Sequence, residues 1–213
     1  MRFSCKLLNS DSYIRQNILQ LLAKDVNNVF KRSVVSIEAK IKILIKDALR
    51  QQPEYLSLVN SAGDLRLNFG IEDMSIVDSA ISNFAGSSSF DYKPVKISTV
   101  GLIGGFSVNF LPQSAIESAS SSSSVITEKG QSLPWLSWLL YEGTSPIIRD
   151  YDIQIGNNPY SRTGGAIMVP SKRNWRVPAS YAGTITNNWI TRAIENKDSE
   201  IYSIIENTIR NNI

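Results

Sequence analysis

The segment from Leu133 to Pro178 has the sequence LPWLSWLLYEGTSPIIRDYDIQIGNNPYSRTGGAIMVPSKRNWRVP and contains three of the chain's four tryptophans. Each tryptophan ring can bury roughly 150–250 Å² of surface, so these rings need a hydrophobic core or a partner surface. Glycine, proline and arginine residues occupy the positions where turns are expected. We therefore expect this segment to form the centre of the fold, with helices packed around it.

Within this central segment, the pattern predicts one short helix and one hairpin. The apolar run Pro134–Leu140 has its large side chains at helical offsets, which predicts a short helix. The runs Ile147–Ile155 and Ala166–Val169 are typical of strands, and the turn residues Gly156–Pro159 between them predict a hairpin.

A long helix is predicted from about Tyr13 to Arg50. Its apolar residues within Phe30–Ala48 alternate in steps of four and three, the spacing of a buried stripe. Upstream, the apolar residues of Ile14–Val26 are spaced by four, so the stripe changes phase near Asn27. The change of phase indicates either a stutter or a break between two helices.

This helix also carries basic residues that lie mostly off the apolar stripe. A solvated helix face is the simpler interpretation, and a surface that meets nucleic acid is the alternative. The set consists of Lys31, Arg32, Lys40, Lys42, Lys46 and Arg50.

Shorter elements are predicted in the middle of the chain. Pro53–Leu58 predicts a short helix with proline in its first turn, and Asp73–Phe84 predicts another. Leu65–Gly70 indicates a short strand or a turn. Val95–Leu111 alternates like a strand, and Gly104–Gly105 marks either a bulge within it or the turn of a hairpin.

The predicted fold class is α+β: an antiparallel β-sheet packed with a long N-terminal helix and a C-terminal helix. The C-terminal helix is expected to run from about Asn188 through Ile209. The serine-rich stretch at about 114–130 is expected to be a flexible loop within a single domain that spans residues 1–213.

Composition narrows the possible functions. The chain of 213 residues has no histidine and one cysteine, which removes Ser-His and Cys-His nucleophile pairs, histidine metal ligands and thiolate zinc sites. A net charge of +3 is too small to imply nucleic-acid binding by itself. No apolar run reaches the roughly 18 residues of a membrane helix, and no secretory signal is evident. We predict no catalytic residue, no cofactor and no metal site.

The central segment contains two groups of polar residues that could bind an ion. Ser161–Gly165 is polar and rich in glycine like an anion-binding loop, but a loop in which Arg162 makes a hydrogen bond is the favoured interpretation. Asp150 and Asp152 are expected on one strand facing the same side. Ion pairs with the neighbouring Arg149, or with Arg162 or Arg176 across the sheet, are favoured over a cation site.

Aromatic and arginine side chains of the central segment are candidate interface residues, because tryptophan and arginine are enriched at binding hot spots. A place in the core is the alternative for the aromatic rings. The candidates are Trp135, Trp138, Tyr141, Arg149, Arg162, Trp175 and Arg176.

The stretch Leu136–Thr144, LSWLLYEGT, resembles the aromatic–Φ–Φ–E–G–T strand-and-turn signature of tail-completion, or neck, proteins of tailed bacteriophages. This is the lambdoid minor-tail-component family. Arg162–Gly164 resembles the R-T-G segment of that family, although here it follows the E-G-T element. The segments Leu133–Leu136, Asp150–Ile153 and Trp175–Pro178 are similar to the version found in contractile-tailed phages of cyanobacteria and other marine bacteria, as is Pro53–Ile71.

The resemblance implies a structural virion protein, made in the host cytoplasm, that forms a ring at the head–tail junction or tail end, commonly of six subunits. Its implied partners are further copies of itself, the connector and neck proteins, and the tail terminator or the tail tube and sheath. DNA would pass through the lumen without sequence specificity, and the basic helix face is a candidate for lining it. The resemblance implies no catalysis and no membrane contact. A tail terminator that caps the tail tube and a DNA-binding module remain alternatives.

Overall fold

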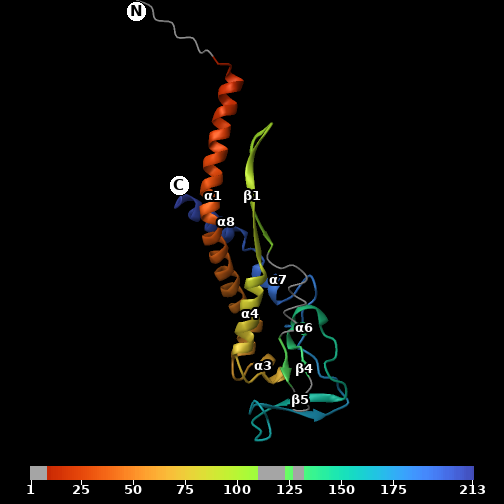
Figure 1. The fold of residues 1–213 in the computed structure, drawn as a ribbon. Helices are drawn as coiled ribbons and strands as arrows, with labels where there is room; N and C mark the ends of the chain where they lie inside the picture. Colours follow the sequence, from red (N-terminus) through yellow and green to blue (C-terminus); the bar gives the residue numbers. More distant parts are fainter. Residues whose placement is uncertain (1–8, 110–122, 127–131) are drawn as a thin grey trace, which may run out of the picture. The chain divides into compact units, whose positions relative to one another are not determined.

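The computed structural model describes residues 9–109, 123–126 and 132–213 (Figure 1). Most of the predicted serine-rich loop lies outside these residues. The fold class is α+β, as predicted. The chain divides into two compact units, each described here by itself. The hairpin unit comprises the N-terminal residues up to Lys40, Ser89–Asn109 and Glu200–Ile213, and the tryptophan unit comprises Ile41–Ser88 and Phe110–Ser199. The single-domain expectation remains a prediction.

The N-terminal helix, α1, is continuous over Asp11–Arg50. A break near Asn27 is therefore wrong, and the change in the apolar pattern is a shift of phase within one helix. Ile37, Ile41 and Ala48 of the predicted stripe are buried, as the four-three spacing indicates. Upstream, only Ala23 is buried among the described residues before Ser33.

In the hairpin unit, β1 (Ser89–Ser98) pairs antiparallel with β2 (Gly101–Asn109). The register slips between Lys93 and Lys96 because β1 has one extra residue there. Opposite this bulge, a Cβ on Gly104 would lie 2.5 Å from the Cα of Val95, so only glycine fits. The predicted single strand over Val95–Leu111 is wrong, because the chain turns between Ser98 and Gly101 and forms a hairpin. Gly104–Gly105 lies within β2 opposite the bulge of β1, so these glycines do not form the hairpin turn.

One asparagine ties the hairpin to α1. The Nδ2 of Asn27 donates to the carbonyl oxygen of Val95 at 2.9 Å, and the Val95 N–H donates to Asn27 Oδ1 at 2.8 Å. The hydroxyl of Tyr92 also donates to Asn27 Oδ1. One turn further along α1, the Phe30 ring packs on Phe106 with 4.7 Å between ring centroids. The polar side chain at the change of phase is thus a tether between helix and strand.

The predicted single C-terminal helix is wrong. The structure has two helices, α7 (Trp189–Ile194) and α8 (Asp198–Arg210). Asn196 between them adopts the left-handed conformation, with φ of 62°. Asparagine tolerates this conformation better than most residues, so it ends one helix and redirects the chain. In the hairpin unit, Lys40 Nζ donates to Thr208 Oγ1 of α8 at 2.9 Å.

The tryptophan unit starts within α1, at Ile41. It continues with α2 (Pro53–Val59), α3 (Asp64–Phe69) and α4 (Ser75–Ser87). The predicted strand or turn at Leu65–Gly70 is wrong, because this stretch forms α3. Leu65, Leu67 and Phe69 are all buried, so alternate residues are apolar as in a strand. α3 has only six residues and is buried at every second position. Its apolar residues therefore cannot show the spacing of three and four that identifies a helix.

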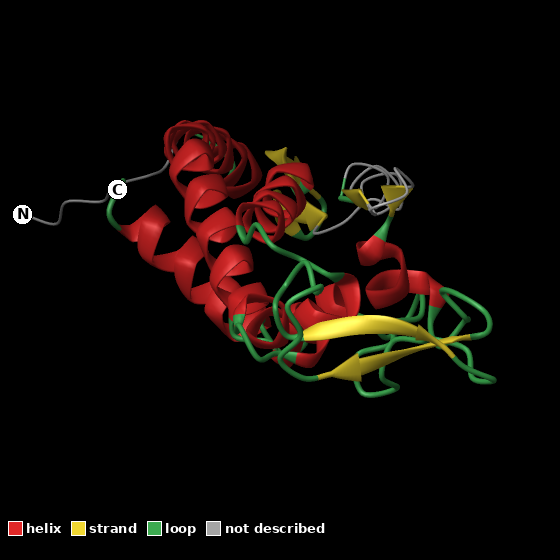
Figure 2. Ribbon diagram, turned by 90° about the horizontal axis from the view of Figure 1, so that it is seen from below, coloured by secondary structure: helices red, strands yellow, loops and turns green. Residues whose placement is uncertain are grey.

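The predicted single sheet is also wrong for the described residues, which form three separate two-stranded ribbons (Figure 2). Besides the β1–β2 hairpin, β3 (Val125–Ile126) pairs with β4 (Ser132–Leu133). The predicted hairpin is confirmed as β5 (Tyr151–Ile155) paired antiparallel with β6 (Ala166–Pro170). Residues 147–150 of the predicted strand lie outside β5, and there Ile148 forms an isolated bridge with Trp175.

The tether predicts a difference between two adjacent asparagines. Asn27→Ala leaves the peptide groups of Val95 without partners, so we expect it to lower the free energy of unfolding by about 1–3 kcal/mol. Asn28→Ala makes the same change of helix propensity on an exposed side chain and should stay within about 0.5 kcal/mol of the wild type. Urea denaturation followed by circular dichroism measures both. Equal effects of the two variants would contradict the tether.

Candidate interaction surfaces

Two of the candidate interface tryptophans form the core of the tryptophan unit. Trp135 is 0% exposed and Trp175 is 4% exposed. Both rings pack around Phe69 of α3, with centroid distances of 6.1 Å and 6.4 Å. The Nε1 of Trp175 donates to Asn68 Oδ1 at 2.9 Å. Trp135 and Trp175 are therefore corrected from interface to core residues, because α3 supplies the surface that their rings need.

The other two aromatic candidates lie on the next turns. α6 (Trp135–Ser137) continues into a π-helix, η1 (Trp138–Glu142). Trp138 is partly buried, whereas Tyr141 is 39% exposed and donates its hydroxyl to Ser137 Oγ at 3.2 Å. The short helix predicted here is confirmed. The strand that belongs to the family signature is absent, because Leu136–Glu142 is helical.

The turn of the E-G-T element is present. Gly143 has φ of 61°, a conformation that favours glycine, and the Ser145 N–H donates to the carbonyl oxygen of Glu142 at 3.2 Å. A second glycine, Gly183, packs against η1. Its N–H donates to the carbonyl oxygen of Trp138 at 2.9 Å, and a Cβ there would overlap the Leu139 carbonyl oxygen.

Two of the candidate arginines fasten loops to the tryptophan unit. Arg162 donates from Nη2 to the carbonyl oxygen of Gly70 at 2.9 Å and pairs through Nε with Glu72 at 3.0 Å. Arg176 donates from Nη1 to the carbonyl oxygen of Thr144 at 2.7 Å. The favoured interpretation of the Ser161–Gly165 loop is confirmed, since Arg162 makes a hydrogen bond with Gly70 and an ion pair with Glu72.

Arg149 differs from those two arginines. Its side chain is exposed, and it makes no hydrogen bond or ion pair with another residue in the described part of the chain. Arg162 and Arg176 are also exposed, so the predicted interface residues that reach the surface are Tyr141, Arg149, Arg162 and Arg176, with Trp138 half-buried.

The aspartate pair does not form the predicted arrangement. Asp152 lies on β5, but Asp150 precedes the strand with φ of 60°. Asp152 pairs with Arg173 at 3.8 Å, which is not one of the predicted partners Arg149, Arg162 and Arg176. Nowhere in residues 9–109, 123–126 and 132–213 do three or more acidic, cysteine or histidine side chains form a group that could hold a metal ion.

The predicted basic face is divided by its environment. Lys31, Arg32 and Lys40 are exposed, and Lys40 donates a hydrogen bond to Thr208. Arg50 pairs with Asp78 at 3.0 Å, and hydrogen bonding to this carboxylate raises the pKa of the guanidinium above its ordinary value. Lys42 and Lys46 are partly buried. Lys31, Arg32 and Lys40 are therefore the members most open to an anionic partner.

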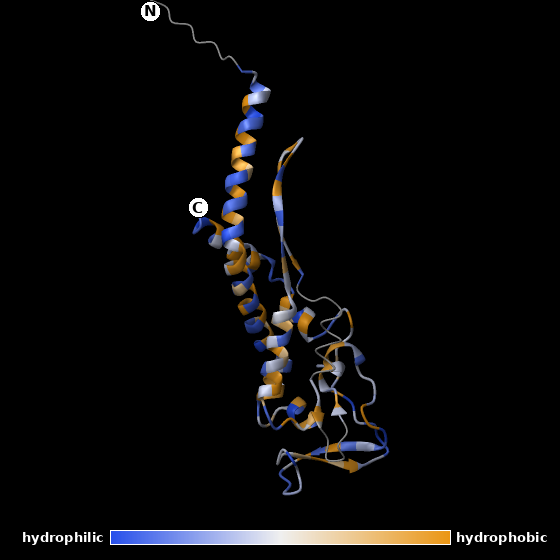
Figure 3. Cartoon of the chain, in the orientation of Figure 1, coloured by the Kyte–Doolittle hydropathy of each residue, from blue (hydrophilic) through white to orange (hydrophobic). Residues whose placement is uncertain are grey.

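Several exposed apolar side chains of the hairpin unit lie outside the predicted interface set. Ile18 and Leu21 on α1 are 51% and 64% exposed, and Figure 3 shows apolar residues along this half of the helix. At the end of the hairpin, Val100 is 82% exposed and Ile103 57%. The signal for the helix residues is their spacing by three and four from Ile14, which places all three on one face. Such residues fit a protein partner.

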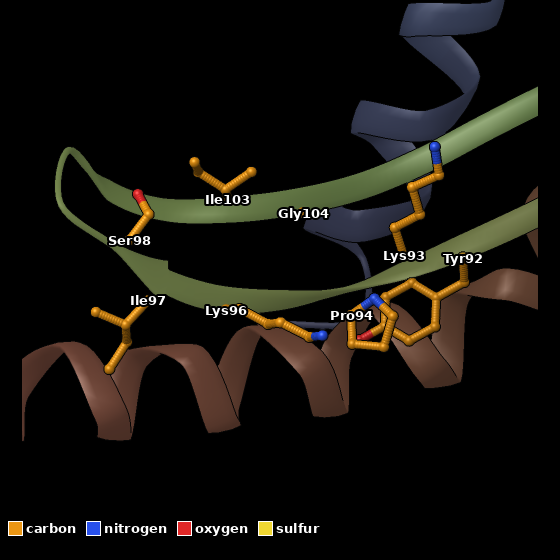
Figure 4. Close-up of a pocket in the computed structure, with 8 residues that line it drawn as sticks. All are labelled: Tyr92, Lys93, Pro94, Lys96, Ile97, Ser98, Ile103 and Gly104. Atoms are coloured by element: carbon orange, nitrogen blue, oxygen red, sulfur yellow. The ribbon is translucent and has the colours of Figure 1, made fainter.

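A shallow groove of about 540 Å³ also lies in this unit, along the hairpin (Figure 4). Its lining includes Pro94, Ile97 and Ile103, with Lys93 and Lys96 beside them. The lining residues include no carboxylate, cysteine or histidine.

The described helices include none that combines the length and the apolar character needed to cross a membrane. The chain matches no protein-family model, no curated protein and no solved structure.

The core position of Trp135 predicts a large effect on stability. Trp135→Ala removes a fully buried ring and should lower the free energy of unfolding by about 3–5 kcal/mol. Tyr160 is 90% exposed, so Tyr160→Ala serves as the control and should change stability by less than about 0.5 kcal/mol. Thermal and urea denaturation test the pair. A Trp135→Ala protein as stable as the control would show that the ring is not part of the core.

Proposed function

We propose that this chain is a structural protein of the neck of a tailed bacteriophage, where copies of it form a ring between the head connector and the tail. The observation that carries the proposal is the resemblance of Leu136–Thr144, Arg162–Gly164 and Trp175–Pro178 to segments of tail-completion proteins. All three segments belong to the tryptophan unit. In that unit the buried residues of these segments form the core, and Gly143 forms a turn. Arg162 and Arg176 bind main-chain oxygens of distant loops, so these residues stabilise the fold.

The exposed side chains also support assembly as the function. A ring requires two different complementary faces on each subunit. Exposed apolar residues in the hairpin unit, and Tyr141 and Arg149 in the tryptophan unit, are side chains of the kinds that protein interfaces use. Proteins that act through such contacts need no catalytic group, and this chain has no histidine to supply the commonest one.

A tail terminator that caps the tail tube is the nearest alternative, because it shares the ring geometry. The two roles differ in when the protein joins the particle. A terminator is added to the finished tail, whereas a protein of the connector side is already present on heads that have not received a tail.

Antibody-gold labelling of virions and of tail-less heads from the source phage tests the proposal. We expect label at the head–tail junction of complete particles in electron micrographs. Label on tail-less heads assigns the protein to the head side, and label on free tails assigns it to the terminator position. Absence of label from every particle, with the antibody shown to bind the native protein, would overturn the virion role.

The rival DNA-binding role makes a different prediction. A module that held duplex DNA through Lys31, Arg32 and Lys40 would show a logarithmic salt slope of about −2.7, because each phosphate contact contributes about −0.9. For a channel protein without sequence specificity we expect only weak binding, and Lys31→Glu/Arg32→Glu should leave particle assembly unchanged. Tight binding with that slope, abolished by the double substitution, would favour the DNA-binding module.

A further inference from the structure

The two edges of the β1–β2 hairpin are protected very differently. The outer edge of β1 contains Pro94, which has no N–H to donate, and the bulge that displaces the strand. The peptide groups of Val95 are already bonded to the amide of Asn27. Lys93 and Lys96 add charge along the same strand. These are the devices by which proteins prevent an edge strand from pairing further.

β2 has none of these devices. Its sequence, GLIGGFSVN, contains no proline and no charged residue. Within the described part of the chain it pairs with β1 alone, and none of its main-chain groups is bonded to a side chain other than that of Ser98. Ile103 and Ser107 are exposed. A two-stranded ribbon is marginal by itself, so a third strand on this edge would add stability as well as satisfy peptide groups.

We propose that the free edge of β2 pairs antiparallel with β2 of a second copy of this chain. The occupant is inferred from the strand's own sequence. When two copies are aligned antiparallel about Gly105, Phe106 lies opposite Gly104 of the other copy and Leu102 lies opposite Val108. Ile103 lies opposite Ser107. Large residues thus meet small ones or other apolar ones, and no like charges face each other.

This pairing goes beyond the proposed function and does not depend on it. The contact has two-fold symmetry, because the same strand is used by both copies. A two-fold contact gives an assembly with equivalent ends, whereas a ring between head connector and tail has unlike ends. The pairing therefore describes a dimer of the free protein, and the proposed ring would use other faces.

Cysteine cross-linking tests the register. In a Cys5→Ser background, Ile103→Cys protein is mixed with Ser107→Cys protein under mild oxidation. We expect the mixture to form a disulfide-linked dimer at least about tenfold faster than either variant alone, since a disulfide needs Cα atoms within about 7 Å. In the proposed register each cysteine faces the other variant's cysteine and is roughly four residues from its own equivalent.

A charge exchange at the same positions provides the matched control. Ile103→Asp/Ser107→Asp places carboxylates opposite each other at two points, so sedimentation velocity should show a shift from dimer toward monomer. Ile103→Asp/Ser107→Lys makes opposite charges meet and should retain the dimer. Monomeric wild-type protein would overturn the proposal, as would equal cross-linking of mixed and single variants.

Discussion

The amide of Asn27, bonded to both peptide groups of Val95, is the interaction on which the hairpin unit depends. A two-stranded ribbon has little stability unless something packs against it. Here the asparagine holds the bulge of β1 on the helix, and Phe30 and Phe106 stack one helical turn away. The same contact explains why a polar residue stands at the change of phase in α1. It replaces an apolar residue of the stripe with a group that can satisfy buried peptide groups.

The sequence was most informative where one side of an element faces the core. The burial of Ile37, Ile41 and Ala48 followed from their spacing, and the β5–β6 hairpin from its turn residues. It was least informative for α3, which is too short and too enclosed to show a helical period. The number of sheets was also beyond reach, because alternation predicts strands and does not specify which strands pair. The separation of α7 from α8 depends on one left-handed residue, Asn196, for which an asparagine is permissive and not diagnostic.

Residue type alone did not separate core from surface among the large side chains. Trp135 and Trp138 are neighbours on consecutive turns, yet one is fully buried and the other is partly exposed. What decides between them is the position of Phe69, which comes from a helix that the sequence did not reveal. The arginines show the same dependence, because Arg162 and Arg176 reach main-chain oxygens distant in sequence while Arg149 does not. Candidate interface residues chosen by type therefore need the fold before they can be sorted.

Unequal protection of the two hairpin edges carries more information than either edge by itself. A chain that only had to avoid aggregation would gain from blocking both strands, since any open edge can pair with another chain. Proline, the bulge and the charged residues lie on β1, and the amide of Asn27 binds this strand as well. Within the described residues, β2 is therefore the open edge of this hairpin. Size alternation along β2 then restricts the register, because a shift of one residue would move Phe106 and Val108 to the opposite face. Strand pairing of this kind contributes main-chain hydrogen bonds for affinity and side-chain fit for selectivity, which is the combination that a defined assembly requires.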